Sequence, residues 1–474
     1  MIFSSTAFLF GFLAIFLAIY HAIPQKFTQI RNLFVLVVSY LFYAWGAPGF
    51  VPLLFFSTVA DYLLGLLLVK TGRRKLILAI SLGINLGLLG YFKYTNFFIA
   101  EVSGVLSLVG FDPLVWTQIA LPLGISFFTF QKISYIVDVY RGVSAPQRNF
   151  IAFALYVALF PKLIAGPIVQ YHDISAQFAE REHTIGAMYE GLIRFCHGLG
   201  KKVLIADTIG VVADTVFQLS SDDLTMPIAW LGALCYTFQI YFDFAGYSDM
   251  AIGIGRMIGF RLPENFNSPY ISTDIRDFWR RWHMSLTNWL RDYLYIPLGG
   301  NRVSQVRTHI NLWAVFVLCG LWHGANWTFL VWGAYHGTLL TVHRVLPSAL
   351  IRKIPGLLQL LGTFVLVLIA WVFFRSDAIL DAFKYIGVMF DLRTLFSVQD
   401  IPFIINSKGW FFLAVAAILS FCPYLYIRFP RMQQAIIRSA PTSYVGGVAA
   451  IIILIYSAIT LSGSTYNPFI YFRF

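Results

Sequence analysis

The segment from Gly320 to Gly337, GLWHGANWTFLVWGAYHG, contains a histidine that could do acid-base chemistry inside a lipid bilayer. His323 stands there among tryptophans and glycines within an apolar run. An ionisable side chain at that depth is costly and rare, and imidazole is the side chain that exchanges a proton near neutral pH. The simpler alternative is a buried histidine that is hydrogen-bonded between two helices. We interpret His323 as the first candidate catalytic residue.

The neighbours of His323 favour the functional interpretation. The small residues that would let two helices approach closely are Gly320, Gly324 and Ala325. Trp322 and Trp327 could wall a cavity, and Asn326, about 60° away around a continuous helix, could orient the imidazole ring. His336 and His343 would point roughly 200 to 220° away from His323 on such a helix. We therefore expect no bound metal, and no three-histidine metal site unless the segment folds back on itself.

A second candidate site is the stretch from Asp277 to Arg302, which is rich in arginine and aromatic residues. Its candidate ligand-binding residues are Arg280, Arg281, Trp282, Asn288 and Arg291. One interpretation is a helix lying in the plane of the lipid headgroups. The other is a vestibule in which guanidinium groups receive an anionic cytosolic ligand, such as the phosphates of a coenzyme. His283 is the one imidazole of this stretch.

Two carboxylates, Asp243 and Asp249, interrupt the apolar run YFDFAGYSDMAIG. Each would cost about 2.5 to 3.5 kcal/mol in the middle of a membrane helix if it had no partner. We therefore expect basic or hydroxyl partners and a structural role, with a proton relay as the alternative.

The composition indicates a polytopic, all-helical membrane protein. Of 474 residues 58% are hydrophobic and only 12% are charged, and aromatic residues are dense, as at membrane interfaces. The net charge of +12 fits attraction to anionic lipids or an anionic ligand better than binding of nucleic acid. The four cysteines lie far apart and form no metal-binding spacing.

About eleven apolar stretches have lengths suited to membrane spans or re-entrant helices. They lie near residues 5–23, 31–46, 50–69, 75–92, 121–137, 149–169, 226–258, 310–341, 355–374, 410–427 and 443–462. No polar segment between them is long enough for a separate domain. We expect one integral-membrane domain, 1–474, with amino-terminal spans (1–120), a core that carries the motifs (121–341) and carboxy-terminal spans (342–474).

Basic loops predict which ends of the spans face the cytosol. The loop Lys70–Lys75 carries four positive charges and belongs inside. Counting back across the preceding spans places Lys26–Arg31 inside as well. The charges of residues 170–220 are mixed and do not indicate on which side of the membrane these residues lie.

The same rule places residues 256–307 and 344–353 in the cytosol. In that case 310–341 enters the membrane and returns, with its turn near Gly320 to Asn326; otherwise it is a single crossing broken by glycines. About 32 helical residues would measure about 48 Å against a hydrocarbon core of about 30 Å, so one straight helix is not expected. His323 lies near mid-membrane in both arrangements, and irregular backbone there requires burial or a water-filled passage.

Ordered blocks along the whole chain resemble the membrane-bound O-acyltransferase superfamily, and within it the branch that acetylates bacterial exopolysaccharides. The blocks are IFSSTAFLF at the start, GYFKYTNF (90–97), LPLGISFFTFQKISYIVDVYRG (121–142), LFPKLIAGPIVQ (159–170), YFDFAGYSDMAIG (241–253), ENFNSPYIS (264–272), FWRRWHMSLTNWLRDYLYIPLGGNR (278–302), LWHGANWTFLVWGAYHG (321–337) and YNPFIYFRF at the end. The hydrophilic stretch before the last span, around 430–441, is short for this family.

The resemblance implies a ring of about eleven transmembrane and re-entrant helices around a thin central partition, with a funnel on each side. His323 matches the active histidine of the family, and His283 matches a second position associated with the active site. The resemblance also implies a bacterial inner-membrane location, a periplasmic acetyltransferase partner protein and a polysaccharide acceptor, most simply alginate.

Our hypothesis from these residues is that a cytosolic thioester, most simply acetyl-CoA, donates an acetyl group while His323 acts as general base toward an acceptor hydroxyl. Asn326, a tryptophan N–H or His283 could stabilise the oxyanion. No permanently bound cofactor is expected. Peptidoglycan, cellulose or teichoic acid are alternative acceptors, and a transporter or flippase is the alternative of another class.

Overall fold

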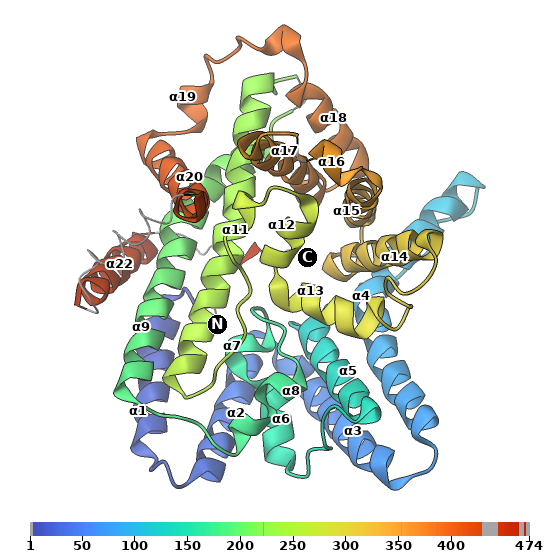
Figure 1. Ribbon diagram of the computed structural model, residues 1–474, viewed down its shortest axis with the longest axis vertical. Coiled ribbons are helices and arrows are strands. Elements are labelled where there is room, and N and C mark those ends of the chain that lie inside the picture. The colour runs from blue at the N-terminus through green and yellow to red at the C-terminus, as the bar shows by residue number, and fades with distance from the viewer. Residues whose placement is uncertain (1–2, 221, 352, 429–443, 464–468, 471–474) are drawn as a thin grey trace. The chain divides into compact units, whose positions relative to one another are not determined.

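The computed structural model describes all residues except 1–2, 221, 352, 429–443, 464–468 and 471–474 (Figure 1). The described part of the chain is helical and contains no strand, which confirms the all-helical prediction. Two compact units are present: Met1–Leu192 with Ala251–Pro263, and Ile193–Met250 with Glu264–Phe474. The expected single membrane domain with three subdivisions stays a prediction.

The first unit is built from the amino-terminal helices. They are α1 (Ala14–Ala22), α2 (Thr28–Gly46), α3 (Val51–Lys70), α4 (Arg74–Leu108), α5 (Ile125–Arg141), α6 (Phe150–Ala158), α7 (Phe160–Leu163) and α8 (Tyr171–Ile174). A π-helical turn, Ala7–Leu13, precedes α1. The helices α9 (Ile185–Gly200) and α11 (Met226–Met257) contribute residues to both units.

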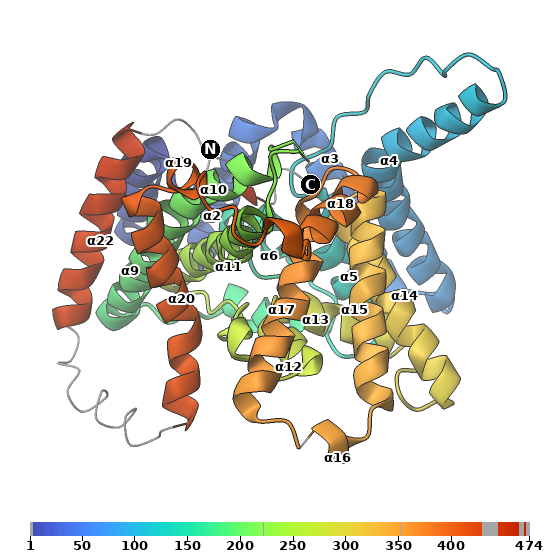
Figure 2. The same ribbon diagram turned by 90° about the horizontal axis from the view of Figure 1, so that it is seen from above.

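The second unit contains both candidate sites. Its further helices are α10 (Asp207–Phe217), α12 (Ile275–Arg281), α13 (Met284–Leu290), α14 (Gln305–His323), α15 (Trp327–Val345), α16 (Ser348–Ile351), α17 (Gly356–Arg375), α18 (Ile379–Met389), α19 (Ile401–Ile404), α20 (Ser407–Arg428) and α22 (Tyr444–Gly463). Within it, α15 packs along both α14 and α17 (Figure 2).

Helix α3 shows the inverted polarity of a membrane span. Phe56 and Leu63 are 67% and 56% exposed, whereas Asp61 is completely buried. The Asp61 carboxylate accepts a hydrogen bond from Asn85 Nδ2 (2.8 Å) and lies 3.6 Å from Lys132 Nζ. Apolar side chains outside and a satisfied polar group inside are what a hydrocarbon solvent requires.

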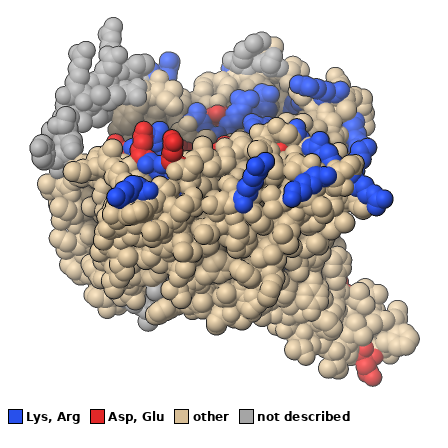
Figure 3. Space-filling view, turned by 90° about the horizontal axis from the view of Figure 1, so that it is seen from below, with Lys and Arg blue, Asp and Glu red and all other residues tan. Residues whose placement is uncertain are grey.

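Five helical segments of the described residues are long and apolar enough to cross a membrane: Pro48–Lys70, Arg74–Leu108, Gly356–Arg375, Ser407–Arg428 and Val445–Gly463. Charged side chains occupy a limited part of the surface shown in Figure 3, and much of the rest carries none. The chain is therefore a multi-pass membrane protein. The predicted ring of about eleven helices is not confirmed, because several of the other apolar stretches fold into short or polar helices.

The stretch 310–341 folds into two helices, α14 and α15, as expected from its length. The break lies at residues 324–326, inside the predicted turn. A Cβ atom added to Gly320 would lie 2.1 Å from the Phe329 carbonyl oxygen, and one added to Gly333 would lie 2.2 Å from the Phe316 carbonyl oxygen. Only glycine permits this backbone contact, so the small residues hold the hairpin closed.

Candidate active site

His323 is the last residue of α14, and its ring is enclosed by aromatic side chains. The distances from its ring centroid are 4.8 Å to Trp322, 5.2 Å to Trp332 and 5.1 Å to Phe374. Three helices, α14, α15 and α17, supply these rings. His323 is 5% exposed, so the imidazole has little contact with solvent in this conformation.

A second imidazole, that of His336, packs against Trp332, one of the aromatic rings that enclose His323. Its ring centroid lies 4.9 Å from that of Trp332. The Trp279 indole N–H donates to His336 Nδ1 at 3.3 Å, so a neutral His336 carries its proton on Nε2. His336 Nε2 and Trp332 Nε1 are buried and have no hydrogen-bond acceptor among the described residues. Two N–H donors thus lie in the aromatic cluster around His323.

His283 is completely buried between α12 and α13 and adopts a left-handed backbone conformation, with φ of +41°. Such a conformation is costly for a residue with a side chain and is often found at functional sites. Asn265 Oδ1 accepts hydrogen bonds from His283 Nδ1 and from the Ser285 hydroxyl, each at 2.9 Å. Because an amide oxygen can only accept, the proton is on Nδ1 and Nε2 keeps its lone pair.

Burial lowers the pKa of His283 to about 3, so this imidazole is neutral at physiological pH. The ring centroids of His283 and His323 lie 6.2 Å and 4.8 Å, respectively, from that of Trp322. The structure therefore brings both predicted catalytic histidines next to the Trp322 indole.

The predicted ligand-binding residues of the arginine-rich stretch lie in different environments. Trp282 is 2% exposed and packs in the core, 4.8 Å from the Trp371 ring centroid. Arg281 forms an ion pair with Asp277 (2.9 Å), and Arg291 forms an ion pair with Asp292 (2.8 Å). Arg280 is exposed and Asn288 is half-buried. A vestibule for an anionic ligand stays a prediction.

Asn326 does not orient His323 as expected. Its side-chain oxygen accepts from the Thr328 backbone N–H (3.1 Å) and so caps α15, while its Nδ2 donates to the Asp377 carbonyl oxygen (2.9 Å). Asn326 therefore joins the tip of the hairpin to the segment that follows α17. Trp327 is 50% exposed, and Trp332 is the tryptophan of α15 that encloses the imidazole.

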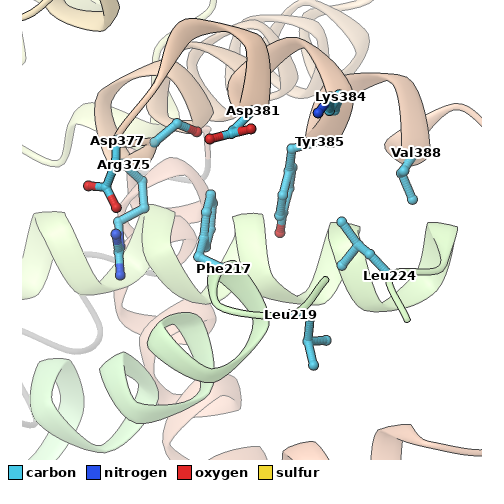
Figure 4. A pocket seen from close by; sticks show the side chains of 10 residues that line it. Phe217, Leu219, Leu224, Arg375, Asp377, Asp381, Lys384, Tyr385 and Val388 are labelled. Atoms are coloured by element: carbon cyan, nitrogen blue, oxygen red, sulfur yellow. The ribbon is translucent and has the colours of Figure 1, made fainter. Parts of the chain in front are cut away.

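A cavity of about 190 Å³ lies beside this junction (Figure 4). Its lining includes Arg375, Ser376, Asp377, Asp381, Lys384, Phe217 and Tyr385. The Phe217 and Tyr385 rings stack with their centroids 4.4 Å apart. Arg375 directly follows Phe374 in α17, and the Phe374 ring centroid lies 5.1 Å from that of His323. His323 itself does not line this cavity.

A larger cavity, about 680 Å³, is lined by α10, the start of α20 and the end of α22. Asp214 belongs to this cavity and Arg375 to the smaller one, and the two side chains form an ion pair at 2.8 Å. The ion pair thus contributes one residue to each cavity.

Both carboxylates of the YFDFAGYSDMAIG run are paired, as expected. Lys202 Nζ lies 2.7 Å from Asp243, and Lys201 Nζ lies 2.6 Å from Asp249, which also accepts from Arg194 at 2.8 Å. These contacts favour a structural role for both acids. Among the described residues, no three ligating side chains are grouped so as to hold a metal.

Sequence reasoning missed Phe374, Trp332 and Asn265. Phe374 is brought to His323 only by the packing of α17, and nothing local in the sequence indicates that contact. The one local signal is the charged run RSD at 375–377, which directly follows an apolar span and indicates a polar site at the end of that helix.

Taken together, the second unit contains a nearly buried histidine with aromatic walls, a second buried histidine and a polar cavity. The chain belongs to the membrane-bound O-acyltransferase family, whose model matches residues 145–376. This segment contains both histidines and ends directly after Phe374 and Arg375. The protein is therefore an acyltransferase, and the alternative of a transporter without acyl chemistry is set aside.

The chain is similar over its full length to named bacterial enzymes. It is 42% identical to the probable alginate O-acetylase AlgI of Azotobacter vinelandii, with all of both chains covered. It is 48% identical to the protein of that name from Pseudomonas aeruginosa, over 83% of this chain and 76% of the relative. It is also 38% identical to the peptidoglycan O-acetyltransferase of Helicobacter pylori, over 83% of this chain and 80% of the relative.

Proposed function

We propose that this protein transfers an acetyl group from cytosolic acetyl-CoA to an extracytoplasmic acceptor, for the O-acetylation of an exopolysaccharide such as alginate. The proposed location is the bacterial inner membrane, and the proposed immediate acceptor is a periplasmic partner protein. The observation that carries the proposal is the position of His323 at the end of α14, in contact with Phe374 near the end of α17.

The direction of the two helices supports access from both sides. Helices α14 and α17 each begin next to a segment that the basic residues place in the cytosol. Their carboxy-terminal ends, with His323 and Arg375, therefore point toward the opposite compartment. The 190 Å³ cavity beside Arg375 is the proposed route for the acceptor hydroxyl, and the segment around His283 is the proposed donor side.

The proposed reaction uses His323 as a general base. Its neutral imidazole takes the proton of the acceptor hydroxyl while the hydroxyl oxygen attacks the thioester carbonyl carbon. The carbon–sulfur bond then breaks, and the leaving thiolate takes the proton back from His323. The acetyl ester and free coenzyme A are the products.

The developing oxyanion requires hydrogen-bond donors in a dry environment. The buried Trp332 N–H, which has no acceptor among the described residues, is the donor that we propose. Asn326 is less suited, because its Nδ2 already donates to Asp377. The aromatic wall of Trp322 and Phe374 must part for the substrates to reach His323, since the ring is 5% exposed.

The proposal is tested with purified protein in proteoliposomes that contain radiolabelled acetyl-CoA on one side. His323→Ala should abolish release of coenzyme A and transfer of label while the thermal unfolding curve stays normal. His343→Ala, at the far end of α15, is the matched control and should remain active. Normal transfer by His323→Ala would disprove the assigned role.

A second candidate acceptor is peptidoglycan, which is favoured by the similarity to the Helicobacter pylori enzyme. The two candidates differ in which polymer loses acetyl esters when the gene is deleted. Proton NMR of the secreted polysaccharide and base-released acetate from purified peptidoglycan distinguish them.

A further inference from the structure

The first unit contains a buried cluster of positive charge that the proposed reaction does not use. Arg31, near the start of α2, is 3% exposed, and its guanidinium carbon lies 4.8 Å from the Tyr20 ring centroid. Arg181, in the loop before α9, lies 4.3 Å from the Phe260 ring centroid. The Tyr20 hydroxyl interacts with both guanidinium groups, so the two cations share one small volume.

Part of each guanidinium is satisfied by neutral acceptors. Arg31 Nε donates to the Ile23 carbonyl oxygen at 2.9 Å, and Arg181 Nη1 donates to Asn32 Oδ1 at 2.7 Å. The nitrogens Arg31 Nη1, Arg181 Nε and Arg181 Nη2 are buried and have no acceptor among the described residues. Apart from the one Tyr20 hydroxyl that both guanidinium groups share, these three donor nitrogens have no described polar neighbour that could accept from them.

No ion pair found among the described residues joins Arg31 or Arg181 to a carboxylate. The nearby acid Glu182 is paired with Arg261 (2.6 Å) instead. The pKa of His183, whose Nε2 lies 2.7 Å from the Tyr20 hydroxyl, is lowered to about 4, first by burial and then by the charge of Arg31. A buried charge without a counter-ion is strongly unfavourable, so an anion is expected here.

The cluster lies at the end of the first unit that the basic loops place in the cytosol. Lys26–Arg31 is the predicted cytosolic loop, and Gln25 Nε2 donates to the His183 carbonyl oxygen at 3.3 Å. These contacts place residues 181–183, whose side the sequence left open, at the same end of the unit. At the cytosolic surface of a membrane, both the phosphates of lipid headgroups and soluble phosphorylated molecules are present.

We propose that Arg31 and Arg181 form a binding site for a phosphate group, carried by an anionic phospholipid or by a soluble ligand. The planar guanidinium groups match the oxygens of phosphate with paired, charge-assisted hydrogen bonds. The remaining guanidinium N–H groups can donate to the non-bridging oxygens that a phosphodiester headgroup and a phosphate monoester both carry. The site is independent of the acyl-transfer proposal.

The experiment uses delipidated full-length protein in uncharged detergent, with inorganic phosphate and phosphatidylglycerol as the two probes. Arg31→Gln and Arg181→Gln should each weaken binding about tenfold or more, as expected when a hydrogen bond to a charged group is lost. Arg261→Gln removes a charge from an exposed ion pair nearby and is the matched control. Equal losses in all three variants, or no binding of either probe, overturn the proposal.

The two probes, inorganic phosphate and phosphatidylglycerol, identify the source of the bound phosphate group. Retention of phosphatidylglycerol in native mass spectra, lost in Arg181→Gln, supports a lipid site. A thermal shift with inorganic phosphate and without retained lipid supports a soluble ligand.

A further variant distinguishes binding from a purely structural role of the arginines. Asn32→Asp would place a carboxylate where Asn32 Oδ1 now accepts from Arg181. Asn32→Asp also replaces the Nδ2 donor to the Phe178 carbonyl oxygen (2.8 Å) by an oxygen, so the readout is the shift caused by phosphate and not the unfolding temperature itself. The internal counter-ion should abolish that shift. An unchanged response of folded Asn32→Asp to phosphate overturns the proposal.

Discussion

Replacing Gly320 by alanine tests whether the close contact between α14 and α15 positions the active site. The added Cβ would lie 2.1 Å from the Phe329 carbonyl oxygen. Non-bonded carbon contacts are most favourable at about 3.5 to 4.0 Å, so the two backbones must separate by about 1 Å or more. Because Trp332 lies on α15 and His323 on α14, the separation changes their contact directly.

The expected loss of activity is large compared with the loss of stability. A displacement of about 1 Å at a reacting centre can reduce the rate about 100-fold. Overpacking costs about 1 to 3 kcal/mol, and the gain from alanine over glycine in a helix returns about 1 kcal/mol. Gly320→Ala should therefore fold, with a lower unfolding temperature, and transfer acetyl groups about 100-fold more slowly.

Gly337→Ala is the matched control in the same hairpin. Its Cβ would lie 3.4 Å from the Trp313 Cα, close to ordinary contact, so activity and unfolding temperature should change little. The assay is the release of coenzyme A from acetyl-CoA by protein in nanodiscs, normalised to folded protein. Equal activity of Gly320→Ala and Gly337→Ala would refute the role assigned to the hairpin contact.

Two further predictions concern buried charge. Lys202→Met removes the partner of the buried Asp243 and should cost about 3 to 5 kcal/mol, whereas Lys201→Met, at a more exposed pair, should cost less; equal falls in unfolding temperature would contradict this. Burial lowers the pKa of His283 to about 3, so the unfolded state takes up this proton first as the pH falls below about 6.5. The wild type should then lose up to about 1.4 kcal/mol of stability per pH unit, and His283→Gln should flatten the fall of unfolding temperature between pH 6 and 4; parallel curves would exclude this contribution.

The parts of the site that sequence predicted are those encoded locally. The break near residues 324–326 follows from glycine and from Asn326, which caps the next helix, and the structure confirms it. The burial of His323 and the pairing of Asp243 and Asp249 follow from the cost of polar groups in an apolar environment. Each of these inferences needs only a short window of residues.

The parts that sequence did not predict depend on helix packing. Trp332 rather than Trp327 encloses His323, because the bend at 324–326 resets the face that α15 presents to α14. Phe374 reaches the imidazole from a helix some fifty residues away. The pairing of Arg31 and Arg181 likewise depends on the packing of a loop against α1 and α2, which no periodicity reveals.

Trp332→Phe tests the proposed oxyanion donor. The substitution keeps an aromatic ring against His323 and removes a buried N–H that has no acceptor among the described residues. Since loss of one oxyanion donor typically costs about 10²- to 10³-fold in kcat, the rate should fall by that factor while KM for acetyl-CoA stays similar.

Stability should stay equal or rise, because an unsatisfied buried donor disappears. Trp371→Phe is the control, since its ring stacks on Trp332 with centroids 5.9 Å apart and its Nε1 is likewise buried without an acceptor among the described residues. A fall in kcat of the same size in both variants would show that packing, and not the Trp332 N–H, supports the reaction.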